Sequence, residues 1–133
     1  MKYIIDSDIL IYFLKGREDV VKAMIGINPE SLFTTRINAT ELLYGAYNSA
    51  HIEKNLQKII PFLKNFKILE FDELSSEIFA KLKAKLKKSG NPIADMDLMI
   101  ASIALANNAI LVTNNTKHFE RIEELTIENW AKT

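Results

Sequence analysis

The sequence contains no cysteine, only three prolines and four glycines, and no surplus of either charge. The absence of cysteine excludes disulfide bonds and thiolate metal sites. Because 17 basic and 17 acidic residues balance, any site for a polyanion must be local. The apolar runs are far shorter than the roughly 20 residues of a membrane-spanning helix, and the first residues lack the pattern of a secretory signal. We therefore expect a cytoplasmic protein without a membrane segment.

Hydrophobic residues, by contrast, are plentiful, at 48% of 133 positions. This content is enough to build one core and leaves little room for a second. The chain has no repeat, no low-complexity stretch and no linker rich in Pro, Gly or Ser. We therefore expect residues 1–133 to form a single domain.

Short β-like runs alternate with longer helical patterns along the whole chain. Strands are predicted over 2–5, 31–35, 66–71, 109–113 and 125–128, and helices over 8–15, 18–27, 36–48, 51–63, 72–88 and 95–107. Pro61 is expected to break or end its helix early. Strands that alternate with helices predict right-handed crossovers and a mostly parallel sheet covered on both faces. The predicted fold class is α/β, a three-layer α/β/α domain.

The opening stretch YIIDSDILI places two carboxylates at the end of the first predicted strand. In an open parallel sheet, ligands bind outside the carboxyl ends of the strands. Asp6 lies at such an end, and Thr113 ends a later strand. An alternative role is helix capping, which competes strongly for Asp8 and less for Asp6.

Two further acids stand on predicted helices. Glu41 lies off the apolar stripe of its helix, and a solvated glutamate is the alternative interpretation. Asp97 shares a helix face with Ile100 and Ala101, so its carboxylate is expected to be partly buried, which is costly unless it is paired or bound to a cation. Asp95 is expected near the cap of the same helix.

Polar residues also follow the apolar strand in LVTNNTKHFERI. Thr113, Asn115 and His118 are candidates to face the same crevice. An asparagine-rich turn without function is the alternative.

Taken in order, strand-DxD, TxxELxxG, DxDLMIA and TxNxxHF resemble the PIN-domain ribonucleases, in particular the VapC toxins of toxin–antitoxin pairs. The resemblance runs from residue 2 to about 130. It implies a Rossmann-like PIN fold and a metal-dependent endoribonuclease that hydrolyses RNA phosphodiester bonds with a metal-activated water. It assigns Asp6, Glu41 and Asp97 as catalytic metal ligands.

The resemblance also assigns supporting roles and partners. Asp95 is an additional candidate ligand, and Asp8, Thr113, Asn115 and His118 are supporting residues. Many members carry a fourth acid at the position of His118, which leaves open whether one or two ions bind. Hard oxygen ligands favour Mg²⁺ or Mn²⁺. The implied partners are an RNA, with tRNA as a candidate, a VapB-type antitoxin, and a second copy in a homodimer.

Contacts to RNA phosphates are harder to predict. The stretch KLKAKLKKSG concentrates lysines, and Lys85, Lys87, Lys88 and Arg36 are the candidates. A solvated helix face is an equally good explanation of these lysines.

Two other functions remain open. One is a phosphatase of the haloacid-dehalogenase type, which also begins with a DxD pair. Its usual downstream threonine is replaced here by Leu10, and no later lysine obviously serves the site. The other is a PIN-like interaction module without catalysis.

Overall fold

A computed structural model describes residues 1–132. Its strands are β1 (Tyr3–Ile5), β2 (Leu32–Thr35), β3 (Lys67–Leu69), β4 (Ile110–Val112) and β5 (Ile127–Glu128). Its helices are α1 (Ser7–Leu14), α2 (Glu18–Ile25), the 3-10 turn η1 (Pro29–Ser31), α3 (Arg36–Tyr47), α4 (Ile52–Leu63), α5 (Glu73–Lys88), α6 (Asp95–Ala106) and α7 (Thr116–Phe119). All described strands are parallel, in the order β3-β2-β1-β4-β5.

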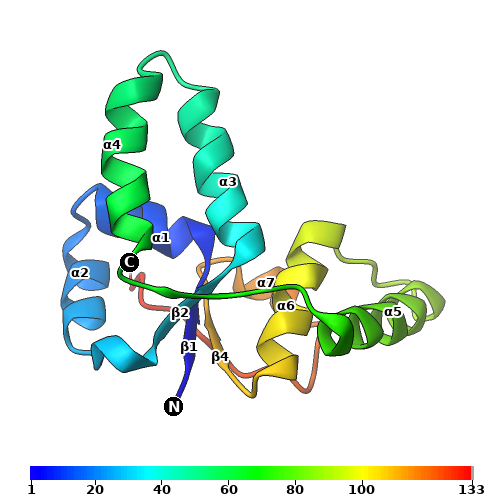
Figure 1. The fold of residues 1–133 in the computed structure, drawn as a ribbon. Coiled ribbons are helices and arrows are strands. Elements are labelled where there is room, and N and C mark those ends of the chain that lie inside the picture. Colours follow the sequence, from blue (N-terminus) through cyan, green and yellow to red (C-terminus); the bar gives the residue numbers. More distant parts are fainter. Residues whose placement is uncertain (133) are drawn as a thin grey trace.

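Helices cover both faces of this sheet, as the alternating pattern predicts (Figure 1). Successive residues of β1 point to opposite faces. Ile4 packs with α5 and α6 in one hydrophobic cluster, and Ile5 packs with α1 and α2 in the other. Leu111 and Val112 of β4 divide in the same way. The predicted three-layer α/β/α architecture is confirmed.

The chain order of the strands creates a switch point between β1 and β4. From β1 the chain proceeds outward through β2 and β3, and then returns to the other side of β1 with β4 and β5. The connections after β1 and β4 therefore diverge to opposite faces, and in open parallel sheets ligands bind at the carboxyl ends of the strands beside such a point. The functional site is therefore expected at the carboxyl ends of β1 and β4.

Several boundaries differ from the prediction for local reasons. The first helix begins at Ser7 rather than at residue 8, and its cap is Asp6 rather than Asp8. Pro61 lies inside α4, which continues to Leu63, because a proline in the last turn removes only one helical hydrogen bond. The short helix α7 was not predicted. None of the described helices is long and apolar enough to cross a membrane.

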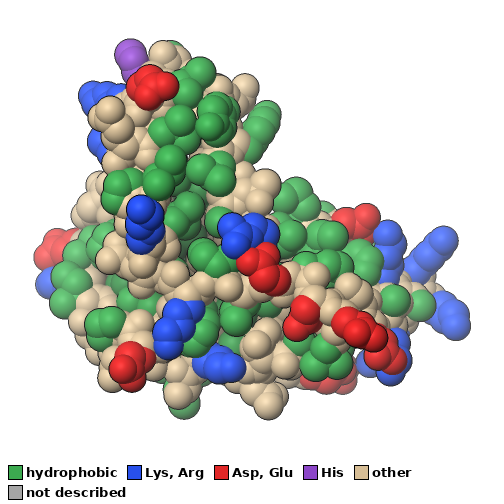
Figure 2. Space-filling view, viewed as in Figure 1, with side chains coloured by type: hydrophobic (Ala, Val, Ile, Leu, Met, Phe, Trp, Pro, Cys, Tyr) green, Lys and Arg blue, Asp and Glu red, His purple; other side chains and the backbone are tan. Residues whose placement is uncertain are grey.

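Two features project from the layered body. The α3–α4 pair stands out as a hairpin above the sheet, and α5 extends outward on the side of α6 (Figure 1). Hydrophobic side chains gather along the hairpin, whereas Lys and Arg side chains gather at the outer end of α5 (Figure 2).

Candidate active site

Asp6 is held at the switch point by hydrogen bonds from three directions. It ends β1, caps α1 and is only 7% exposed. Its Oδ1 accepts from the Ser7 backbone at 2.8 Å and from Asn38 Nδ2 at 2.9 Å. Its Oδ2 accepts from Thr113 Oγ1, just beyond β4, at 2.7 Å. The capping role and the role in the site therefore belong to the same carboxylate.

Burial raises the pKa of the Asp6 carboxyl above its ordinary value. Hydrogen bonds from Thr113, Ser7 and Asn38 act in the opposite direction, and the charge of Asp97 adds to the rise. Asp6 is thus a carboxylate in a position where its negative charge costs free energy. A nearby cation would remove that cost.

Asn38 joins Asp6 to the third helix, and the sequence analysis missed it. It is fully buried in the first turn of α3, where its Oδ1 accepts from Thr35 Oγ1 at 2.7 Å. Its Nδ2 donates to Asp6 and also to Ser7 Oγ, at 2.9 Å each. Its position three residues before Glu41 was a usable signal, because residues three apart share a helix face.

Glu41 is brought to this network through Ser7. The Ser7 hydroxyl donates to Glu41 Oε1 at 2.7 Å. Burial raises the pKa of Glu41, the Ser7 bond opposes the rise, and the charges of Asp6 and Asp97 reinforce it. Glu41 is therefore half-buried and hydrogen-bonded to Ser7.

Asp97 approaches from the opposite side of the crevice, in the first turn of α6. Its Oδ2 lies 3.4 Å from His118 Nδ1, which in turn lies 2.9 Å from Asn115 Nδ2. The Asn115 backbone donates to Thr113 Oγ1 at 3.0 Å. Through His118 and Asn115, Asp97 is thus linked to the Thr113 hydroxyl that holds Asp6.

Asp8 flanks this group and ties α1 to the loop after β4. It accepts from its neighbour Ile9 N at 2.7 Å and from Asn114 N at 3.0 Å. Burial, reinforced by the charge of Asp6, raises the pKa of Asp8 to about 6.

Other predicted residues are engaged elsewhere. Asp95 pairs with Lys83 at 2.9 Å, because residues two apart on a helix do not face the same way. Arg36 forms a two-pronged ion pair with Glu70. The last turn of α5 carries the remaining candidates, Lys85, Lys87 and Lys88. That end of α5 points away from the sheet (Figure 1), so the RNA contacts stay predictions.

Carboxylate oxygens are suitable ligands for a hard divalent cation, but the described acidic side chains do not converge on one point. Within residues 1–132, no three acidic or histidine side chains are close enough together to hold a metal ion. Asp6 and Glu41 are instead occupied by Thr113, Asn38 and Ser7. Carboxylates without a cation repel one another. Burial raises the pKa of Asp6 and of Glu41, so a bound cation would stabilise their charged forms. Carboxylate oxygens are also the ligands that Mg²⁺ and Mn²⁺ prefer.

Comparison with known proteins gives a consistent result over nearly the whole chain. The PIN domain family matches residues 3–125. The chain is 35% identical to "Ribonuclease VapC2" of Haemophilus influenzae, covering 98% of this chain and 99% of that protein. It is 31% identical to the "tRNA(fMet)-specific endonuclease VapC" of Shigella flexneri, with the same coverage.

Solved structures agree. VapBC-1 from nontypeable Haemophilus influenzae matches with a TM-score of 0.91 and 34% identity, covering 99% of this chain and 100% of that one. DNA-bound VapBC from Salmonella typhimurium matches with a TM-score of 0.92 and 29% identity, covering 98% and 99%.

Proposed function

The chain belongs to the PIN-domain family, and from that premise we propose that it is an endoribonuclease toxin of the VapC type, one half of a toxin–antitoxin pair. Relatives of nearly equal length are ribonucleases by name. The observation that carries the proposal is the hydrogen-bond network at the carboxyl edge of the sheet, in which Asn38 and Ser7 join Asp6 to Glu41 while Thr113 holds the other oxygen of Asp6.

The catalytic cofactor in this proposal is Mg²⁺ or Mn²⁺, held by Asp6, Glu41 and Asp97. Such an ion supplies a Lewis acid for the phosphate and lowers the pKa of a water that attacks phosphorus. Asp95 is not needed as a ligand, since Lys83 already neutralises it.

The residues around the ligands orient them. Thr113 and Asn38 hold the two oxygens of Asp6, and Ser7 holds one oxygen of Glu41. Such bonds fix the direction of a metal ligand before the ion arrives. His118, beside Asp97, is placed to contact a phosphate or a water at the rim of the crevice.

The substrate in this proposal is RNA, with tRNA as the first candidate, because relatives in Shigella flexneri and Salmonella typhimurium are named tRNA(fMet)-specific endonucleases. The partner is a VapB-type antitoxin, as in the VapBC complexes of similar fold. A groove of about 460 Å³ between α1, α3 and α4 supports this partner. Apolar Ile11, Leu14 and Ile59 line it, and Glu41 borders it, so an amphipathic segment seated there would reach the acidic crevice. The toxin itself is expected to form a homodimer.

The comparisons do not favour the two alternatives. A phosphatase of the haloacid-dehalogenase type would need the downstream threonine that Leu10 replaces here. An interaction module without catalysis has no need of a hydrogen-bond network that orients Asp6 and Glu41.

The experiment is sequencing of RNA 5′ ends after induced expression of the chain, beside its Asp6→Asn variant. New ends at defined sites are expected with the wild-type chain and not with the variant. The same ends from both proteins, or from neither, would contradict the proposal.

A further inference from the structure

The loop over residues 113–115 supplies contacts to three groups of the site. Thr113 Oγ1 donates to Asp6, the Asn114 backbone N–H donates to Asp8, and Asn115 contacts His118. The position of this one loop therefore affects two carboxylates and one imidazole at once.

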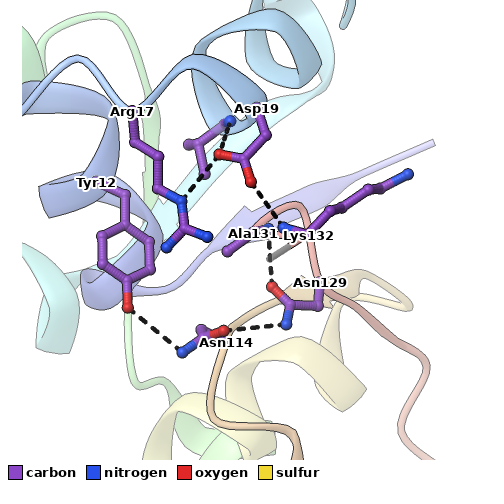
Figure 3. A network of polar contacts seen from close by, with 8 residues as sticks. Tyr12, Arg17, Asp19, Asn114, Asn129, Ala131 and Lys132 are labelled. Atoms are coloured by element: carbon purple, nitrogen blue, oxygen red, sulfur yellow. Dashed lines mark hydrogen bonds and ion pairs between the residues drawn. The ribbon is translucent and has the colours of Figure 1, made fainter.

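The side chain of Asn114 points away from the site and is held from behind. Its Nδ2 lies 3.4 Å from the Tyr12 hydroxyl, a long and weak contact. Its Oδ1 accepts from Asn129 Nδ2 at 3.1 Å. Figure 3 shows Asn114 lying between Tyr12 on α1 and Asn129 in the segment after β5.

The segment that carries Asn129 is itself firmly attached. Asn129 Oδ1 accepts from the Ala131 backbone at 2.9 Å. Asp19, at the start of α2, accepts from the Lys132 backbone at 2.7 Å and also pairs with Arg17 (Figure 3). Between these bonds, Trp130 is buried and packs against Tyr3 of β1. The C-terminal segment thus offers a fixed point against which a loop can be held.

We infer that Asn114 and Asn129 form a clamp that positions the 113–115 loop, and that this clamp is required for full ribonuclease activity. The inference rests on the proposed function. Neither side chain bonds to Asp6, Glu41 or Asp97, so both are positioning residues rather than catalytic ones.

The physical reason is that the loop follows a strand of only three residues. Without the clamp, its contacts with Asp6, Asp8 and His118 must themselves hold it in place. Misplacement of about 1 Å in a catalytic arrangement can cost around a hundredfold in rate. A loosened loop should therefore lower kcat more than it changes KM.

The test compares Asn114→Ala, Asn129→Ala and the double variant, with Asn65→Ala as a matched control. Asn65 makes exposed bonds to the carbonyls at the end of α4, and its side chain bonds neither to the 113–115 loop nor to Asn129. We expect kcat for RNA cleavage to fall about tenfold in Asn114→Ala and severalfold in Asn129→Ala, with KM nearly unchanged. The double variant should be no slower than Asn114→Ala, because the same clamp is removed. Asn65→Ala should cleave like wild type.

A second measurement does not depend on activity. In the metal-free chain, hydrogen exchange of the Asn114 and Asn115 amides should accelerate about tenfold in Asn129→Ala, while that of the β1 amides stays unchanged. Additive losses in the double variant, or unchanged exchange at 114 and 115, would overturn the clamp. A wild-type chain that does not cleave RNA would instead overturn the proposed function, and the exchange result would still decide the clamp.

Discussion

Thr113 donates a 2.7 Å hydrogen bond to the Asp6 carboxylate although 107 positions separate the two residues. The bond exists because β1 and β4 are parallel neighbours, so their carboxyl ends meet at the same edge of the sheet. Both residues are buried. A hydroxyl in this position directs one oxygen of Asp6 and leaves its charge for a cation.

Replacing Thr113 with Val removes this hydroxyl at nearly constant volume. We expect RNA cleavage to fall by about 10- to 100-fold, the usual cost of losing a partner of a metal ligand, and the free energy of unfolding to fall by about 1–3 kcal/mol. Thr34→Val is the matched control, because buried Thr34 donates a bond of equal length, 2.7 Å, to the Ile5 carbonyl. Initial rates and urea denaturation give both quantities. Equal loss of activity in the two variants would mean that Thr113 acts only through stability.

Asp95 and Asp97 allow a sharper comparison within one helix. Asp97→Asn should lower the rate of cleavage at least about a hundredfold. Residues that only hydrogen-bond to a metal ligand already cost up to about that factor when they are mutated. Asp95→Asn removes an exposed pair with Lys83, which contributes less than about 1 kcal/mol, and should leave cleavage within about twofold. Rates at saturating Mg²⁺ decide the matter. Equal rates in the two variants would remove Asp97 from the ligand set.

The pH dependence of the free energy of unfolding should reveal the raised pKa of Asp8. The pKa of Asp8 is raised to about 6 in the folded chain, above the value of about 4 expected when unfolded. The folded state therefore binds this proton more tightly, so the stabilisation is complete below about pH 4 and is lost as the pH rises through about 6. The Asp8→Asn variant has no proton to release at this position, so its stability does not fall for this reason. In the presence of EDTA, the stability of the variant relative to wild type should rise between pH 4 and 7.

Comparing the Asp8→Asn variant with wild type separates the effect of Asp8 from that of acids whose pKa is lowered by folding. Asp72 and Glu70 have lowered pKa values, through hydrogen bonds from Ser75 and Arg36, and their stabilisation is lost as the pH falls. They contribute equally to both proteins. A difference between Asp8→Asn and wild type that does not change with pH would contradict the account.

His118 lies 3.4 Å from Asp97, at the rim of the proposed metal site. His118→Asp should bind Mn²⁺ about tenfold more tightly, because each added charged oxygen ligand strengthens a hard-cation site. His118→Asn, which adds no charge, is the control. Calorimetric titration with Mn²⁺ measures affinity and stoichiometry together. The same affinity in both variants would show that residue 118 lies outside the metal's reach.

Much of the architecture could be predicted because strands and helices leave patterns among residues that are close together in the sequence. The runs YII and AILV indicated strands buried on both faces, and their parallel alignment brought Asp6 and Thr113 to one edge. The helix face shared by Asp97, Ile100 and Ala101 was confirmed, since Ile100 and Ala101 are fully buried. Alternation and periodicity act over neighbours, so a single sequence displays them.

Other features depend on three-dimensional context. Ser7 became part of the site only because β1 and β2 are parallel neighbours, which brings the starts of α1 and α3 to the same edge of the sheet. The four-residue α7 is too short to show helical periodicity. The ion pairs of Arg36 and Lys85, with Glu70 and Glu124, join residues far apart in sequence.

The central claim is that Asp6, Glu41 and Asp97 share one divalent cation. A crystal of the chain soaked in Mn²⁺ tests it most directly, through the anomalous signal of the metal. The account predicts a peak within about 2.0–2.6 Å of an oxygen from each of these three residues, the range of metal–oxygen bonds to hard cations. A soaked crystal with no peak between them, and with the three carboxylates still directed as they are now, would contradict it.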